Sequence, residues 1–157
     1  MIRSTISMIL AFAILLSSTS LVYAHCQVPC GIYDETIRFT AMREDASTIA
    51  KATRLIQELS GKSDATSIQQ LVRWTMTKED HASNIIKVVA EYFLTQKIKP
   101  ADPKNKKSYA AYVDVLASCH RVMRAAMVTK QKADPAAVAA LNAAVEDLAS
   151  RFNHSHK

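Results

Sequence analysis

Two cysteines and a histidine lie close together near the start of the chain, at His25, Cys26 and Cys30. If the chain were cut before His25, that residue would offer a free α-amine and an imidazole, and Cys26 would offer a backbone amide nitrogen and a thiolate. The amine, the amide and the two thiolates can lie in one plane, which suits Ni(II) or Cu(II), with the imidazole left for an axial position. The spacing therefore indicates a transition-metal site, in a loop shaped by Pro29 and Gly31.

A disulfide between Cys26 and Cys30 is the alternative interpretation, because exported chains usually oxidise their cysteines. The chain has three cysteines, so at least one has no partner within it. Cys119 belongs to an apolar helical pattern, which predicts a small buried side chain rather than a ligand. A disulfide and a metal site exclude each other, and the histidine beside Cys26 favours the metal.

Residues 1–24 are typical of a signal peptide. Arg3 supplies the positive start, residues 6–16 are apolar apart from Ser7, and Ala24 ends a suitable cleavage pattern. The apolar run is shorter than the roughly 20 residues that span a bilayer. We therefore expect a processing peptidase to cut after Ala24, so that the mature chain begins at His25, has no stable membrane association, and is periplasmic or extracellular.

The formal net charge of +6 raises the question of a nucleic-acid partner. The chain has no interleaving of basic and aromatic residues and no helix-turn-helix pattern, so we expect none. A modest excess of lysine is also typical of an ordinary soluble surface.

The remainder of the chain predicts an all-α fold, an antiparallel four-helix bundle over residues 34–153 with a frayed tail at 154–157. The first helix is expected from Asp34 to a stop at Gly61, the second over 67–97, the third around 109–127, and the fourth from Pro135. Ile68, Val72 and Met76 are assigned to the apolar stripe of the second helix. Its polar patch, residues 78–81, is expected to face solvent or to mark a kink.

The stretch His-Cys-x-x-Pro-Cys-Gly-x-Tyr, residues 25–33, resembles the metal-binding hook of nickel superoxide dismutases. All six specified residues are present, and four helices follow. The resemblance implies a homohexamer of four-helix bundles that binds one nickel ion per subunit and converts superoxide to oxygen and hydrogen peroxide. We refer to residues 25–33 as the hook.

Individual roles follow from the same resemblance. His25 is implied as a ligand through its amine and imidazole, Cys26 through its amide and thiolate, and Cys30 through its thiolate. Tyr33 matches the tyrosine that screens the open face of the metal, and Tyr92 matches a second tyrosine near it.

The resemblance also implies two groups that hold the axial imidazole, a carboxylate on the first helix and a basic residue on the second. Thr40 or Glu44 is a candidate for the first position, and His81 is a candidate for the second. The sequence leaves the choice between Thr40 and Glu44 open.

Three other interpretations of the chain remain open at this stage. The same hook would serve an exported nickel or copper binding protein without enzymatic activity. A structural bundle with an N-terminal disulfide would need no metal. Trimming of a short propeptide in the cytoplasm is the alternative to export.

Overall fold

The computed structural model describes residues 35–152. The predicted signal peptide, hook and frayed tail fall on residues 1–34 and 153–157, outside the described residues. Within the described range all elements are helical: α2 (Glu35–Leu59), α3 (Ala65–Val88), the π-helix η1 (Val89–Lys97), α4 (Lys106–Gln131) and α5 (Pro135–Phe152). The all-α prediction is confirmed.

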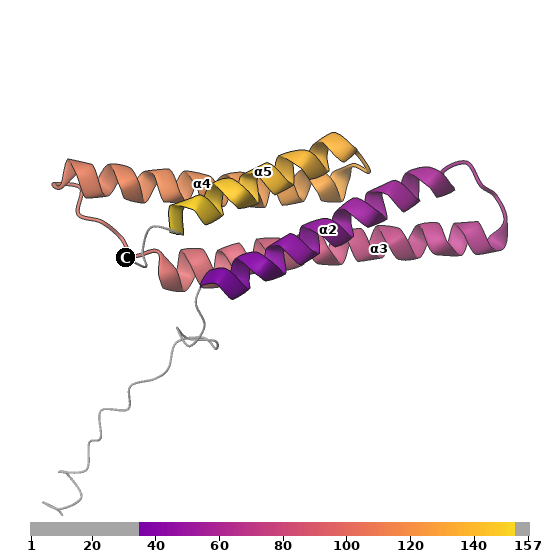
Figure 1. The fold of residues 1–157 in the computed structure, drawn as a ribbon, viewed down its shortest axis with the longest axis horizontal. Coiled ribbons are helices and arrows are strands. Elements are labelled where there is room, and N and C mark those ends of the chain that lie inside the picture. Colours follow the sequence, from indigo (N-terminus) through magenta and orange to yellow (C-terminus); the bar gives the residue numbers. More distant parts are fainter. Residues whose placement is uncertain (1–34, 153–157) are drawn as a thin grey trace, which may run out of the picture. The chain divides into compact units, whose positions relative to one another are not determined.

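The four long helices form one bundle in which each helix packs against two neighbours (Figure 1). Helix α2 contacts α3 and α5, and α4 contacts the same two helices from the other side of the core. Short connections at residues 60–64 and 132–134 join antiparallel neighbours, as in other bundles with up-and-down topology. None of the described helices is long and apolar enough to cross a membrane.

Local sequence signals set the helix ends. Gly61 adopts a positive φ of 86° just beyond α2, a conformation that favours glycine. The Asp64 carboxylate accepts a hydrogen bond of 2.9 Å from the Ser67 amide at the start of α3, and hydrogen bonds from the Ser67 side chain and amide lower the pKa of Asp64. Asp134 accepts a similar bond of 2.9 Å from the Ala136 amide at the start of α5.

The core follows the predicted apolar faces for most of its length. Aromatic rings fill the end of the bundle where α2 begins: the Phe93 ring centroid lies 5.0 Å from those of Phe39 and Phe152. Further along, the buried side chains come from all four helices: Met42, Ile49, Ile85, Val122, Leu141, Val145 and Leu148. Their burial is the main favourable term that holds the helices together.

The predicted stripe of α3 is wrong in its first half. Ile68, Val72 and Met76 are 48%, 53% and 60% exposed. Residues four apart advance by about 40° around a helix, so this row winds away from the buried face that carries Ala82 and Ile85. The three side chains therefore form an uncovered apolar row on the described subunit.

The polar patch at residues 78–81 neither marks a kink nor faces solvent as a whole. Helix α3 runs through it unbroken, and Lys78 is buried, donating to the backbone carbonyls of Thr129 and Lys130 near the end of α4. The last carbonyls of a helix have no partner within it, so the ammonium group satisfies them.

The departure from regular α-helix occurs further along, in η1. There the Ile98 amide donates to the Phe93 carbonyl at 2.9 Å, five residues back. The Thr95 hydroxyl reaches the carbonyl of Ala90, also five residues back, at 2.7 Å. Segments of π-helix are rare in proteins, and those that occur often lie at functional sites. This one carries the buried rings of Tyr92 and Phe93.

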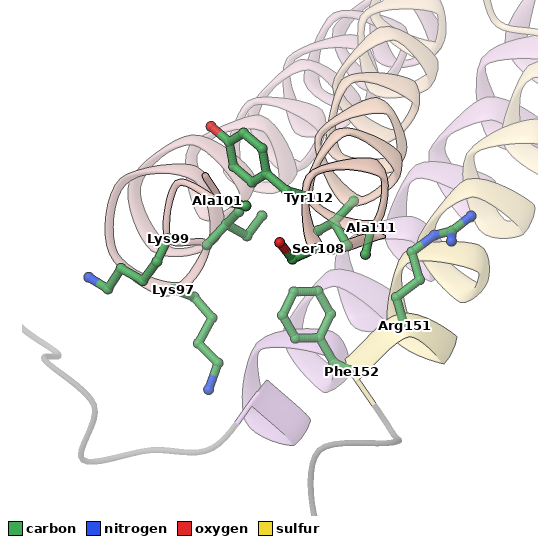
Figure 2. Close-up of a pocket in the computed structure, with 10 residues that line it drawn as sticks. Lys97, Lys99, Ala101, Ser108, Ala111, Tyr112, Arg151 and Phe152 are labelled. Atoms are coloured by element: carbon green, nitrogen blue, oxygen red, sulfur yellow. The ribbon is translucent and has the colours of Figure 1, made fainter. Parts of the chain in front are cut away.

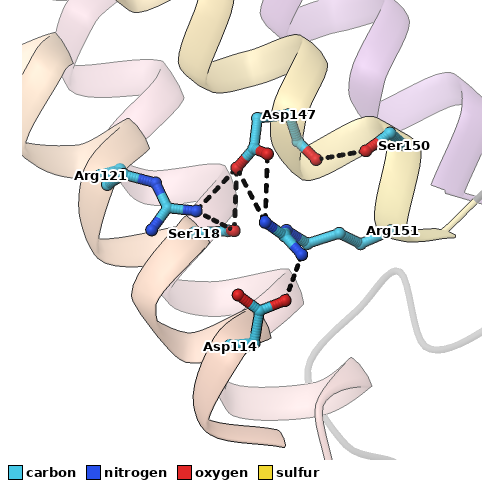
Figure 3. A network of polar contacts seen from close by, with 6 residues as sticks. All are labelled: Asp114, Ser118, Arg121, Asp147, Ser150 and Arg151. Atoms are coloured by element: carbon cyan, nitrogen blue, oxygen red, sulfur yellow. Dashed lines mark hydrogen bonds and ion pairs between the residues drawn. The ribbon is translucent and has the colours of Figure 1, made fainter. Parts of the chain in front are cut away.

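A polar network ties α4 to α5 (Figure 3). The Asp147 carboxylate accepts hydrogen bonds from Arg121 at 2.8 Å and from the buried Ser118 hydroxyl at 3.0 Å, and Arg151 bridges Asp147 to Asp114. The bond from Arg121 is the main cause of the lowered pKa of Asp147. The network holds the C-terminal turn of α5 against α4.

Candidate metal centre

The predicted ligands His25, Cys26 and Cys30 and the predicted screen Tyr33 lie outside the described residues. In the chain the hook is followed by Asp34 and then by α2, so the first turn of α2 contains its nearest described neighbours in sequence.

Two charged side chains join the start of α2 to the end of η1. Glu35 is only 5% exposed, and its carboxylate forms an ion pair with Lys97. A buried carboxylate needs such a partner, because burial alone disfavours the charged form. The pair therefore holds the first turn of α2 against the last turn of η1.

Arg38, one turn further along α2, stacks on Tyr92. The guanidinium carbon lies 5.0 Å from the centroid of the Tyr92 ring, a cation–π distance. Tyr92 is 7% exposed and meets Phe93 edge to face, with centroids 5.1 Å apart and ring planes at 89°. The Nε atom of Arg38 is buried and has no hydrogen-bond partner among the described residues.

The structure thus places Tyr92, which the family resemblance singled out, at the end of the bundle where α2 begins. Sequence reasoning missed Arg38. The one available signal was a basic residue directly before Phe39, at the edge of the buried face of α2.

A surface pocket of about 340 Å³ opens at the same end, between η1, the start of α4 and the end of α5 (Figure 2). Its wall combines apolar groups such as Ile98, Tyr112 and Phe152 with the cations Lys97, Lys99 and Arg151. Lys97 and Arg151 form ion pairs with Glu35 and Asp114. The pocket is therefore amphipathic, with apolar groups and three cations in its wall.

His81 contacts a carboxylate of α2, but neither Thr40 nor Glu44 provides it. Its Nδ1 atom lies 2.6 Å from Oδ1 of Asp45. The side chain of Asp45 is 14% exposed and that of His81 is 32% exposed, so the pair is only partly shielded from water. Thr40 instead donates to the Thr36 carbonyl within its own helix at 2.9 Å, and Glu44 is exposed. Sequence reasoning missed Asp45 because no local pattern marks it.

Cys119 is fully buried in the core, as predicted, and burial raises the pKa of its thiol to about 11. Metal ligation needs the thiolate, so this cysteine is chemically unsuited to be a ligand. The described residues also contain no group of three or more histidine, cysteine or acidic side chains that could hold a metal ion. Cys26 and Cys30 therefore stay the predicted thiolate donors, with His25 as the predicted nitrogen donor, in a set that suits Ni(II) or Cu(II).

The comparisons with known proteins identify the family of this chain. The family model described as nickel-containing superoxide dismutase matches residues 20–156, which include the hook and every described helix. The search of curated proteins gave no match, and neither did the search of solved structures. Nickel is the cofactor of this family, superoxide is its substrate, and the activity is that of an oxidoreductase. The chain belongs to the nickel-containing superoxide dismutase family.

Proposed function

We propose that the hook is the nickel site at which this protein dismutates superoxide. The observation that carries the proposal is the family match over residues 20–156, which spans the hook and the bundle together. No observation supports the alternative of a metal-binding protein without enzymatic activity. The buried, protonated thiol of Cys119 also leaves the two hook cysteines as the available thiolates.

Each residue of the hook has a distinct task in this proposal. Cys26 and Cys30 bind through thiolates, Cys26 also through its backbone amide, and His25 through its amine and imidazole. Nickel in such a donor set supplies the one-electron change needed to oxidise one superoxide and reduce another. Tyr33 screens the open side, admits small anions and water, and can order a water molecule through its hydroxyl.

Export and processing are part of the same proposal. The amine of His25 exists only after removal of residues 1–24, so a peptidase that cuts after Ala24 would complete the ligand set. The apolar run at residues 6–16 supports a secretory leader and a periplasmic or extracellular location.

We further propose that the subunits assemble, most simply as the homohexamer implied by the family resemblance. Support comes from the uncovered row of Ile68, Val72 and Met76 on α3 and from Tyr109 and Val113 on α4, all at least 39% exposed. Exposed apolar side chains that gather in such rows are typical of protein–protein contacts.

One preparation tests both proposals. Protein that begins at His25, verified by mass spectrometry, should contain one nickel ion per chain, consume superoxide, and sediment at six times the subunit mass. Protein loaded with copper instead is the control for a metal carrier. Stoichiometric nickel without superoxide consumption would contradict the enzymatic proposal, and a fully active monomer would contradict the assembly.

We also propose that Asp45 and His81 together hold the His25 imidazole. The support is their 2.6 Å contact, which joins a carboxylate of α2 to a basic side chain of α3. A carboxylate beside an imidazole fixes its ring orientation and tautomer. In this proposal Asp45 has the role for which Thr40 and Glu44 were the sequence candidates.

Asp45→Asn is expected to lower kcat about tenfold or more while nickel stays bound, because loss of a group that orients a metal ligand typically costs 10- to 100-fold. Glu44→Gln is the matched control, since Glu44 precedes Asp45 on α2 and is exposed. We expect nearly wild-type turnover from the control. Equal losses in both variants, or none in Asp45→Asn, would argue against the assignment.

A further inference from the structure

We infer that two copies of this chain associate through their α2–α3 hairpins, with the row of Ile68, Val72 and Met76 on one copy packed against the same row on the other. This inference rests on the proposed assembly, and it specifies the surface and the partner of one of its contacts. It follows from the low burial at this end of the hairpin, the side of α3 that carries the row, the scarcity of charge around it and the spacing of its side chains.

The end of the α2–α3 hairpin is poorly covered. None of residues 54–77 is buried in the part of the chain that the structure describes. In Figure 1 the connection between α2 and α3 lies further out than the connection between α4 and α5. Large apolar side chains are nevertheless frequent in this segment: Leu55, Ile56, Leu59, Ile68, Leu71, Val72, Trp74 and Met76. Each helix of a hairpin buries one side against its neighbour, and a second apolar side needs a further element to cover it.

The row lies on the side of α3 that contacts α4 further along the helix. Residues eleven apart are about three turns apart, so their side chains lie within about 20° of each other around the helix. Glu79 is eleven residues after Ile68, and Ser83 is eleven residues after Val72. Both contact Lys130 in the last turn of α4, whose Nζ atom lies 3.6 Å from Oε2 of Glu79 and donates to the Ser83 hydroxyl at 2.9 Å. The row therefore continues the α4-facing side of α3 beyond the end of α4, where a helix from another molecule fits.

Helix α2 covers the opposite side of the same half of α3. The ammonium group of Lys51 lies 5.4 Å from the centroid of the Trp74 ring. Trp74 is two residues after Val72, so the two side chains point about 200° apart around the helix. The packing of α2 against α3 thus leaves the row accessible to a second partner.

The charge pattern of this half of α3 favours a second copy as that partner. From Ala65 to Thr77 the sequence has one charged residue, Arg73, which lies about 100° around the helix from Val72. Interface cores are depleted of charged residues and enriched in methionine. In a contact between identical surfaces a charge near the symmetry axis would face its own like charge, and this neutral row avoids that repulsion.

The spacing of the row also fits the packing of one helix against another. Its members are four residues apart, so they form a ridge along α3, and two such ridges interlock when the helices cross at about −50°. Val72 is the middle residue of the row, so in a twofold contact it lies nearest the axis and faces its own copy. The two hairpins together then form a four-helix layer between the subunits.

Opposite charges at Val72 test the inference. Val72→Glu and Val72→Lys each set like charges against one another in a contact between identical copies, whereas a mixture of the two variants pairs opposite charges. Val72 is 53% exposed in the subunit, so neither substitution removes a buried side chain. Arg73→Gln is the matched control, because it also changes the charge by one unit, but on a different side of α3. Nickel-loaded chains that begin at His25 are analysed by sedimentation velocity, singly and as an equimolar mixture, with circular dichroism as the check of the fold.

Each charged variant alone should sediment below the mass of wild type while keeping the wild-type circular dichroism. The dissociation constant of the contact should rise about a hundredfold or more, because like charges juxtaposed across an interface are strongly unfavourable. The equimolar mixture should regain the wild-type mass, and Arg73→Gln alone should match wild type.

Wild-type mass in both charged variants would overturn the inference. A mixture that stays dissociated would also overturn it, since the row would then contact a different surface. A monomeric wild-type protein would contradict the inference and the proposed assembly together. Superoxide consumption is measured on the same wild-type sample, so an inactive but assembled protein would contradict the enzymatic proposal while the sedimentation results still decide the contact.

Discussion

Replacing either sulfur ligand, with Cys26→Ser or Cys30→Ser, is expected to reduce superoxide consumption to the background rate. A serine hydroxyl has almost the same size as a thiol, but it does not ionise near neutral pH. The nickel site would therefore lose a soft anionic donor and its preferred planar geometry. Metal analysis, visible absorption and superoxide consumption of protein verified to begin at His25 measure the effect.

Substitutions of the remaining hook residues should reduce turnover to different degrees. His25→Gln keeps the amine and both sulfurs, so nickel should stay bound while turnover falls sharply. Tyr33→Phe keeps every ligand and most of the screen, so it should retain substantial activity with altered saturation or inhibition by peroxide.

Cys119→Ala is the matched control for the cysteine variants. Its thiol is buried in the core with a raised pKa, so nickel and turnover should be unaffected even if the fold loses some stability. If Cys30→Ser kept the nickel spectrum and the rate of wild type, the hook would not be the metal site. The disulfide or carrier interpretations would then have to be reconsidered.

The helix ends could be predicted from sequence because the signals that start and stop a helix are local. Gly61 beyond α2 and the capping carboxylates Asp64 and Asp134 each act within three residues of the backbone they satisfy. The four-helix architecture follows once these ends divide the apolar pattern into segments with short connections.

The buried face of α3 could not be predicted in the same way, because it depends on which neighbours cover the helix. Met76 fits the apolar pattern and is 60% exposed, whereas Lys78 is charged and buried. The burial of Lys78 is favourable because the end of α4 supplies two backbone carbonyls to its ammonium group. That contact joins residues about 50 positions apart, so no local pattern contains it.

The candidate site also combines features that depend on neighbouring residues in the sequence with features that depend on helix packing. The metal donors could be predicted because His25, Cys26 and Cys30 are close in sequence and their chemistry alone suggests nickel or copper. The contacts between helices could not, since Arg38 meets Tyr92 and Asp45 meets His81 only after α2 has packed against the α3–η1 helix. These contacts depend on the rotation of one helix relative to the other, which no local sequence pattern specifies.

Retaining a single residue before His25 is expected to abolish nickel-dependent activity while leaving the bundle folded. A free α-amine has a lone pair that can bind a metal, and its pKa of about 8 leaves a useful neutral fraction at physiological pH. Joined to a preceding residue, the same nitrogen becomes a planar amide whose lone pair is delocalised into the carbonyl, so it can bind a metal only after it loses its proton. The site would thus lose its amine donor although every side chain is still present.

The bundle should keep its fold and stability, because the described residues that pack its core begin at Glu35 and Phe39, ten or more positions further along the chain. Circular dichroism and the thermal unfolding midpoint should therefore match those of the processed protein, whereas nickel content and superoxide consumption should not. The matched control carries the same extra residue behind a protease site, so that cleavage restores His25 as the first residue. Recovery of nickel binding and turnover after cleavage would show that the amine itself is the missing ligand. Full activity of the extended protein, with mass spectrometry confirming that the extra residue is still attached, would show that the amine of His25 does not bind nickel.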